Sequence, residues 1–320
     1  SKGYDFLAVY IGPILMFVFG WPLLRRVVQL SKAQNITSIA DFIAARYGKS
    51  PAVAAIVTLL CVVGSLPYVA LQLKAVANST ETLLGGKPLL PFELPLLGTP
   101  ETAFVTALLL ATFAILFGTR HIDATEHQDG LILAIATESI VKLLAFLTVG
   151  FFVVFVAFGD LSGFIAALKS RADVAEFTDV SLSGNAWLTI GFLSFVCILL
   201  LPRQFHVTVV ENHSENELRR ARWLLPLYLV LINLFVVPIA ATGLLIVPST
   251  LAEPDMYVLA VPMVKGADTV SAIVYLGGLS AGMAMVVVEM VALSIMVFFA
   301  LSLQCLSTLA VLRKESGSWT

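Results

Sequence analysis

Glu138 and Lys142 lie four residues apart in an otherwise apolar stretch, "ATESIVKLLAF", which covers residues 136–146. On a helix this spacing places both side chains on one face, with Glu on the N-terminal side, the more favourable order. A charged side chain at membrane depth is costly and therefore usually faces a partner or water. Two interpretations stay open: a self-neutralised pair that holds one helix against another, or a pair that lines a water-filled solute pathway.

Glu289 is a second carboxylate in an apolar run, "GMAMVVVEMVALS", and no basic residue lies within four positions of it. Its partner is expected from another element. Alternatively, the carboxyl is neutral and bonded to a backbone carbonyl, because burial disfavours the charged form. Ser294 follows on the same predicted helix. Its hydroxyl is expected either to bond back to the preceding turn or to offer an oxygen to a hard cation such as sodium.

Helix-breaking residues precede another polar side chain, Gln72, in "GSLPYVALQ". Gly64 and Pro67 predict a broken helix here, which is tolerated at membrane depth where protein or a water-lined cavity satisfies the freed carbonyls. Transporters use such breaks to form ligand sites, although Pro kinks also occur in purely structural spans. We therefore add Gln72 to the three charged residues above as a candidate lining of the solute and ion pathway.

Three polar residues follow Pro202 in "LLLPRQFHV", namely Arg203, Gln204 and His206. Proline at the end of an apolar run indicates that the span ends there. We predict that the three side chains form a gate at the cytoplasmic mouth of the pathway. His206 is expected either to titrate near neutral pH or to be solvated at the interface.

Metal and catalytic motifs are not evident in the sequence. His121 and His127 flank a polar loop, "GTRHIDATEHQDG", but their spacing fits no tight metal site. The sequence has no GxSxG, HExxH, P-loop or GxGxxG element, and no polar stretch is long enough to form a nucleotide domain. We therefore expect neither an enzyme, nor a metal site, nor a nucleic-acid partner.

The composition places these residues in a membrane protein. Hydrophobic residues make up 59% of the 320 positions and charged residues 12%, and the mean hydropathy is +0.96. These values lie far outside those of a soluble domain. We predict one all-α membrane domain at residues 1–302, followed by a polar tail at 303–320.

The predicted domain has about seven transmembrane helices, because each apolar run must supply about 20 residues to cross the hydrocarbon. The spans are expected near residues 4–24, 52–77, 102–119, 130–158, 186–202, 222–247 and 269–302. Of the Lys and Arg residues outside these spans, twelve fall on one side and six on the other. The richer side is assigned to the cytoplasm, and the protein is expected to be a multi-pass protein of the cell's inner (plasma) membrane.

Short elements are predicted between the spans. "NITSIADFIAARYGKS" is expected to form an amphipathic helix at the cytoplasmic interface, in which Ser38 caps the helix, Asp41 completes a capping box and Gly48 ends it. Three outer loops are expected: a Pro- and Gly-rich loop, residues 160–184 with room for a surface helix, and residues 248–268.

Three of these segments resemble segments of the sodium:solute symporter family. "TSIADFIAARYG" resembles the family's T-x-x-E-[FY]-L-x-x-R-[FY]-G, with Asp41 in place of the usual Glu, and "YVALQLKAV" is similar to its Gln-bearing next helix. "PRQFHVTVVENHSENELRRARW" resembles the cytoplasmic stretch after a later core helix. Its pattern residues are Ser214, Glu217, Arg219, Arg220 and Arg222. The resemblance runs from about residue 4 to residue 297.

The stretch "GTRHIDATEHQDGLILAIATESIVKLLAF" is similar to one branch of this family. In that branch, the CbrA-type proteins, a symporter domain is fused to a sensor histidine kinase and is associated with histidine and amino-acid use. The resemblance implies that this chain is a fragment without the kinase.

The resemblance also implies a partial five-plus-five inverted-repeat bundle of the LeuT kind. The first span then matches the second core helix, so a helix with half of the sodium and substrate ligands is expected before residue 1. The helix of Glu138 and Lys142 matches the fifth core helix, beside the inward exit path. In the eighth core helix, which usually carries adjacent hydroxyls for sodium, "ALSI" offers only Ser294.

Two functions follow from the resemblance. The first is transport of a small organic solute, an amino acid such as histidine, with Na⁺ as the coupling ion. The alternative is a non-transporting receptor whose pocket senses the solute and signals to a fused or associated histidine kinase. The expected partners are the solute, the lipid bilayer and that kinase.

Overall fold

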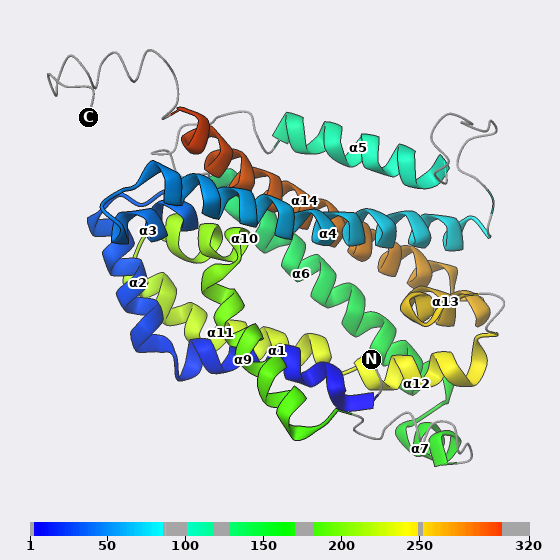
Figure 1. The fold of residues 1–320 in the computed structure, drawn as a ribbon. Helices are drawn as coiled ribbons and strands as arrows, with labels where there is room; N and C mark the ends of the chain where they lie inside the picture. The colour runs from blue at the N-terminus through cyan, green and yellow to red at the C-terminus, as the bar shows by residue number, and fades with distance from the viewer. Residues whose placement is uncertain are drawn as a thin grey trace, which may run out of the picture.

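The computed structural model describes residues 3–85, 87, 101–117, 129–169, 182–248 and 252–302. Within these ranges the chain forms helices and turns and contains no strand (Figure 1), which confirms an all-α protein. The predicted tail at 303–320, the Pro- and Gly-rich loop at 88–100 and the histidine-containing loop at 118–128 lie outside the described residues.

The helices differ widely in length. In chain order they are η1 (Gly3–Phe6), α1 (Leu7–Val18), α2 (Trp21–Ala33), α3 (Ile39–Arg46), α4 (Pro51–Leu83), α5 (Glu101–Phe117), α6 (Asp129–Phe151), η2 (Phe152–Ala157), α7 (Leu161–Lys169), α9 (Gly184–Leu200), α10 (Pro202–Phe205), η3 (His206–Val210), α11 (Glu215–Asn233), α12 (Val236–Ile246), η4 (Pro254–Met256), α13 (Tyr257–Val264) and α14 (Asp268–Ser302).

Four described helical segments are long and apolar enough to cross a membrane, or up to six if each bent pair counts as one span. The four are Pro51–Leu83, Gly130–Ala157, Glu215–Ile246 and Asp268–Phe298. In the 18-residue apolar stretch of Pro51–Leu83, only 11% of the residues are buried within the protein. This is expected for side chains that face lipid rather than a protein core. The count of seven spans and the LeuT-type arrangement are not confirmed. The third expected span corresponds to a shorter apolar helix, Thr102–Leu116.

Two apolar helices end in sharp bends. α1 and α2 meet at 68°, and α9 meets the α10–η3 segment at 56°. Pro202 opens α10 after the extended residue Leu201, so the helix ends before Pro202 as predicted; that the span ends there stays a prediction. The break predicted at Gly64 and Pro67 is wrong, because α4 continues through Pro67 as one helix of 33 residues. A membrane helix tolerates an internal proline where local adjustments satisfy the freed backbone groups.

The long helices form two packed groups. In one group α14 packs against α4, α5 and α6, and in the other α1 packs against α9 and α11. α10 joins them, since it follows α9 in the chain and contacts α14. The α1–α9 crossing is very close. A Cβ on Gly12 would lie 2.5 Å from the backbone nitrogen of Phe195, and small residues allow such close helix packing in membranes.

Separate apolar cores hold the two ends of the bundle. One core joins α1, α2, α3 and η3 with the last part of α14, and includes Leu24, Phe205 and Met296. The other joins α6, α7, α12 and α13 with the first part of α14, and includes Val149 and Val261. Figure 1 shows α2 and α3 at one end of the long helices and α12 and α13 near the other.

The short helix predicted between the first two spans is confirmed as α3. Ser38 Oγ accepts a hydrogen bond from the Asp41 backbone nitrogen at 3.1 Å, and Asp41 Oδ2 accepts one from the Thr37 backbone nitrogen at 3.3 Å. Gly48 then takes a left-handed conformation, with φ of 67°, just after the helix ends. This conformation favours glycine.

The outer loop predicted at 248–268 is wrong in its described part. Residues 254–264 form η4 and α13, whose residues Leu259, Ala260 and Val261 are almost fully buried. The segment is too short to cross a membrane and therefore gave no span signal. In the loop at 160–184, the surface helix considered from the sequence is present as α7.

Candidate functional site

Arg203 is the centre of the candidate site. Its Nη1 donates a hydrogen bond to the Tyr68 hydroxyl at 2.5 Å, and its guanidinium carbon lies 4.9 Å from the centroid of the Tyr68 ring. The bend between α9 and α10 starts two residues earlier, so it directs this side chain toward the middle of α4. A cation over an aromatic face is a stabilising arrangement, most of all where water is excluded.

Glu138 and Lys142 lie on α6, and both are half-buried. Each interacts electrostatically with the other and with Arg203. No hydrogen bond or close ion pair joins Glu138 to Lys142 in the described structure, and Glu138 Oε1 is buried without a hydrogen-bond partner. The two side chains therefore do not form a closed ion pair, and the cluster contains two basic side chains and one acidic side chain. Of these groups, Glu138 Oε1 is fully enclosed by the protein.

The cluster extends to the second helix group through Tyr228 on α11. This side chain interacts electrostatically with Glu138 and with Tyr10 of α1, and it is half-buried. α11 also packs directly against α6. The candidate site therefore lies where the two helix groups meet, and its side chains come from α4, α6, α10 and α11. A relative movement of the groups would change these contacts.

Glu289 has the partner from another helix that the sequence led us to expect. The hydroxyl of Ser65 on α4 donates to Glu289 Oε1 at 2.5 Å, and the carboxyl group is 4% exposed. The alternative of a neutral carboxyl bonded to a backbone carbonyl stays a prediction. Tyr68 also bridges this seam, because its hydroxyl donates to Met285 Sδ at 3.0 Å.

The seam between α4 and α14 continues toward the far end of α4. There Thr80 Oγ1 lies 3.0 Å from the hydroxyl of Tyr275, and Gly282 allows Val76 to approach α14 closely. Glu289 therefore belongs to a continuous interhelical contact that includes polar bonds at several depths. Ser65, which bonds to Glu289, precedes Tyr68 by three positions on α4, and Tyr68 bonds to Arg203. Glu289 is therefore linked to the cluster through these two residues of α4.

The remaining predicted residues are less closely connected to the cluster. Gln72 and Gln204 are half-buried on α4 and α10, and neither makes a hydrogen bond within the part of the chain that the structure describes. Gln72 lies on the helix face that carries Ser65 and Tyr68, since the three are separated by three and four positions. That spacing is the sequence signal for Ser65 and Tyr68, two residues that were not predicted.

His206 does not lie at a solvated mouth, so that part of the prediction is wrong. It is 4% exposed in η3, and its Nε2 lies 3.2 Å from Glu211 Oε1 without the alignment of a hydrogen bond. η3 packs against α2 and continues from α10. The π-helical turn of η3 carries the side chain into the protein, so the three predicted gate residues do not form one surface.

The predicted cation ligand, Ser294, is half-buried on α14. Its hydroxyl does not bond back to the preceding turn in the described structure, unlike that of Ser79 on α4, which donates to the Ala75 carbonyl at 2.8 Å. Sodium coordination by Ser294 stays a prediction. Among the residues that the structure describes, no three His, Cys, Asp or Glu side chains gather as a metal site would require.

Searches of protein-family models, of curated proteins and of solved structures found no match to this chain.

Proposed function

We propose that this chain is the membrane domain of a symporter-type carrier that binds a small zwitterionic solute, an amino acid, at the cluster of Glu138, Lys142 and Arg203. The observation that carries the proposal is the buried oxygen of Glu138 without a hydrogen-bond partner. A buried acceptor of this kind is costly unless something binds to it. The α-ammonium group of an amino acid supplies the missing donors.

The two cations of the cluster complement the other half of such a solute. Arg203 and Lys142 outnumber Glu138, so the cluster has an excess positive charge that a carboxylate would neutralise. An arginine binds a carboxylate through two parallel hydrogen bonds. The Tyr68 ring and hydroxyl hold the guanidinium in position, which lowers the entropic cost of forming these bonds.

The location of the cluster supports a transport role. It lies between two helix groups, and one of its residues follows the 56° bend between α9 and α10. Broken helices at membrane depth are a common way to build substrate sites in carriers. We propose Na⁺ as the coupling ion, with Ser294 as a ligand, and the plasma membrane as the location. Histidine is the first amino acid to test.

Uptake into proteoliposomes tests this function. The purified chain is reconstituted, and uptake of radiolabelled amino acids is measured with an inward sodium gradient, with equal sodium on both sides and with a proton gradient. We expect accumulation only with the sodium gradient, and we expect Glu138→Gln to abolish it. Glu253→Gln is the matched control, because it makes the same chemical change at an exposed carboxylate outside the cluster. Equal loss in both variants would contradict a role of the cluster.

A second function, a solute-sensing receptor, is favoured by Ser294. Only one hydroxyl is available where symporters of this kind usually have adjacent ones, so sodium binding would be weak. In a receptor the same cluster binds the amino acid and the change in helix packing passes to a histidine kinase. Saturable binding that needs no sodium, without accumulation inside the vesicles, would favour the receptor over the carrier.

A further inference from the structure

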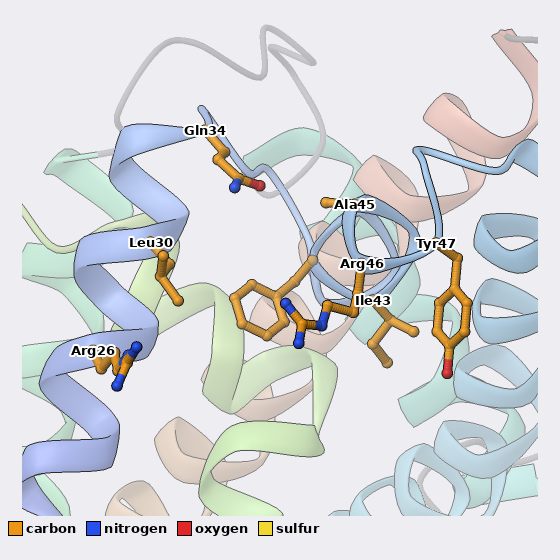
Figure 2. A pocket seen from close by; sticks show the side chains of 8 residues that line it. Arg26, Leu30, Gln34, Ile43, Ala45, Arg46 and Tyr47 are labelled. Atoms are coloured by element: carbon orange, nitrogen blue, oxygen red, sulfur yellow. The ribbon is translucent and has the colours of Figure 1, made fainter.

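An open groove separates α2 from α3, away from the cluster described above. Its volume is about 580 Å³, and it is lined by Arg26, Leu30, Gln34, Phe42, Ile43, Ala45, Arg46 and Tyr47. Figure 2 shows Arg26 and Leu30 on α2 at one side of the groove, and Arg46, which points toward α2, with Ile43 on α3 at the other side. The groove therefore combines two cationic groups with an apolar floor.

The two arginines have no acidic partner within the described part of the chain. The neighbouring Arg25 differs, because its Nη2 lies 2.9 Å from Glu215 Oε2 at the start of α11. Arg26 and Arg46 are both exposed, and neither donates a hydrogen bond to a described residue. Two unneutralised guanidinium groups across one groove favour a multivalent anion, and phosphate oxygens match the planar donors of arginine.

The groove lies beside α2, a helix that leaves the direction of the long apolar helices. α2 turns away from the apolar α1 by 68°, and Figure 1 shows it crossing one end of the long helices instead of running along them. Arg25, Arg26 and Lys32 occupy one part of its surface, while Leu24, Val27 and Val28 are buried against the core. A basic amphipathic helix at this place lies in the interface between headgroups and acyl chains.

The apolar residues of the groove are accessible for contact with lipid chains. Leu30 is 44% exposed, and Leu23, about two helical turns before it, is 49% exposed. Since the polar atoms of the arginines and the apolar side chains of Leu30, Phe42 and Ile43 line the same groove, an occupant with one anionic and one apolar part fits it best. A free phosphate would leave the apolar floor exposed to water.

We propose that this groove binds an anionic phospholipid, with its phosphate between Arg26 and Arg46 and an acyl chain along Leu30 and Ile43. The bound lipid links α2 to α3, and through α3 it reaches the start of α4, against which α3 packs. The proposal does not depend on the solute that the central cluster binds.

Lipid titration followed by native mass spectrometry tests the proposal. The full chain in detergent is titrated with phosphatidylglycerol and, separately, with phosphatidylcholine of the same acyl chains. We expect selective retention of phosphatidylglycerol by the wild-type chain. The double variant Arg26→Gln/Arg46→Gln should bind it about thirtyfold more weakly, the effect of two basic residues near an anionic lipid surface.

The control variant is Lys32→Gln/Lys49→Gln, which removes the same charge at exposed positions that do not line the groove. It should retain phosphatidylglycerol as the wild type does, and Arg26→Lys/Arg46→Lys should retain most of it. Equal losses in the control and in the groove variant would overturn the proposal in favour of general surface electrostatics. Glycerol phosphate competing as well as the lipid would overturn it in favour of a simple anion site. Unchanged circular dichroism of the variants shows that they fold.

Discussion

The two carboxylates within the apolar helices, Glu289 and Glu138, have opposite environments. Glu289 lies in the seam between α4 and α14, is almost fully buried and accepts a short hydrogen bond from Ser65. Glu138 lies where the two helix groups meet, is half-buried and has a buried oxygen without a partner. Sequence alone gives both as acids in apolar runs. The structure therefore separates an acid whose oxygen has a hydrogen-bond donor within the fold from one that has a buried oxygen without a donor.

The same contrast applies to the helices that carry them. Of the 18-residue apolar stretch of α14, 56% of the residues are buried within the protein. The corresponding share for the segment Gly130–Ala157, which contains α6, is 33%. A helix that is enclosed on most sides can satisfy a polar group with a neighbour in a fixed position. A helix at the boundary between two groups has fewer neighbours in fixed positions, and one carboxylate oxygen on α6 has no hydrogen-bond donor. The comparison predicts that mutations at the two acids have different consequences.

Glu138→Gln should give the largest functional effect. Loss of one partner of a buried charge interaction usually costs about 2–5 kcal/mol of binding free energy, a factor of about 30 to several thousand. Amino-acid affinity in detergent, measured by scintillation proximity, should fall by at least this lower factor, while thermal stability should be unchanged or slightly higher. Glu289→Gln, in which the amide oxygen still accepts from Ser65, is the matched comparison. If it lowers affinity equally, the distinction between the two acids is wrong.

Ser65→Ala should give the largest effect on stability, because it leaves a buried carboxyl group without its partner. The expected loss is about 1–3 kcal/mol in the free energy of unfolding, measured by unfolding in mixed detergent micelles. Replacing both residues by apolar ones, Ser65→Ala/Glu289→Leu, should recover much of this loss, because no buried polar atom is then left unpaired. If the losses of unfolding free energy from Ser65→Ala and Glu289→Leu simply add in the double variant, the contact between α4 and α14 does not depend on this hydrogen bond.

Tyr68→Phe should have an intermediate effect on amino-acid affinity, since Tyr68 contacts both Arg203 of the cluster and Met285 in the seam between α4 and α14. The substitution keeps the ring beneath Arg203 but removes the hydroxyl that accepts from Arg203 and donates to Met285. The loss of one such bond corresponds to about 0.5–1.5 kcal/mol, so affinity should fall by about two- to tenfold. Tyr68→Leu, which also removes the ring, should lower it further. Equal effects of the two variants would mean that the hydroxyl alone holds Arg203.

Apolar runs and polar interruptions predicted the helical class, the inward-facing acids and the cap of α3, because each depends on local composition or spacing. Glu138 and Arg203 could be selected singly from the cost of placing a charge in an apolar run. Their proximity could not be predicted, because it depends on how α10 turns after Leu201. His206 was misplaced for the same reason: the π-helical turn of η3 rotates it into the core. Ser65 and Tyr68 were not predicted, because Gly64 and Pro67 indicated a helix break between them, whereas α4 continues through both positions as one helix.

Asp160 extends the comparison to a carboxylate outside the apolar helices, where the smallest effect is expected. Its Oδ1 accepts from the Gly163 backbone nitrogen at 2.6 Å and its Oδ2 from the Ser162 hydroxyl at 2.7 Å, at the start of α7. The Gly163 N–H, and then the Ser162 hydroxyl, lower the pKa of this exposed carboxyl group below its usual value. Because the pKa in the folded state is depressed, the stabilisation of α7 is present above the unfolded-state pKa. It is lost as the pH falls through the folded-state pKa.

Hydrogen exchange at the first amides of α7 measures this local effect. Protection should decrease as the pH is lowered below about 4, the ordinary range of an aspartate, after correction for the intrinsic exchange rate. Asp160→Asn should reduce the protection slightly at neutral pH and remove its dependence on acid, because an amide still accepts hydrogen bonds but does not titrate in this range. Amides in the buried part of α14 serve as the internal control. An acid dependence that persists in Asp160→Asn would assign the effect to another group.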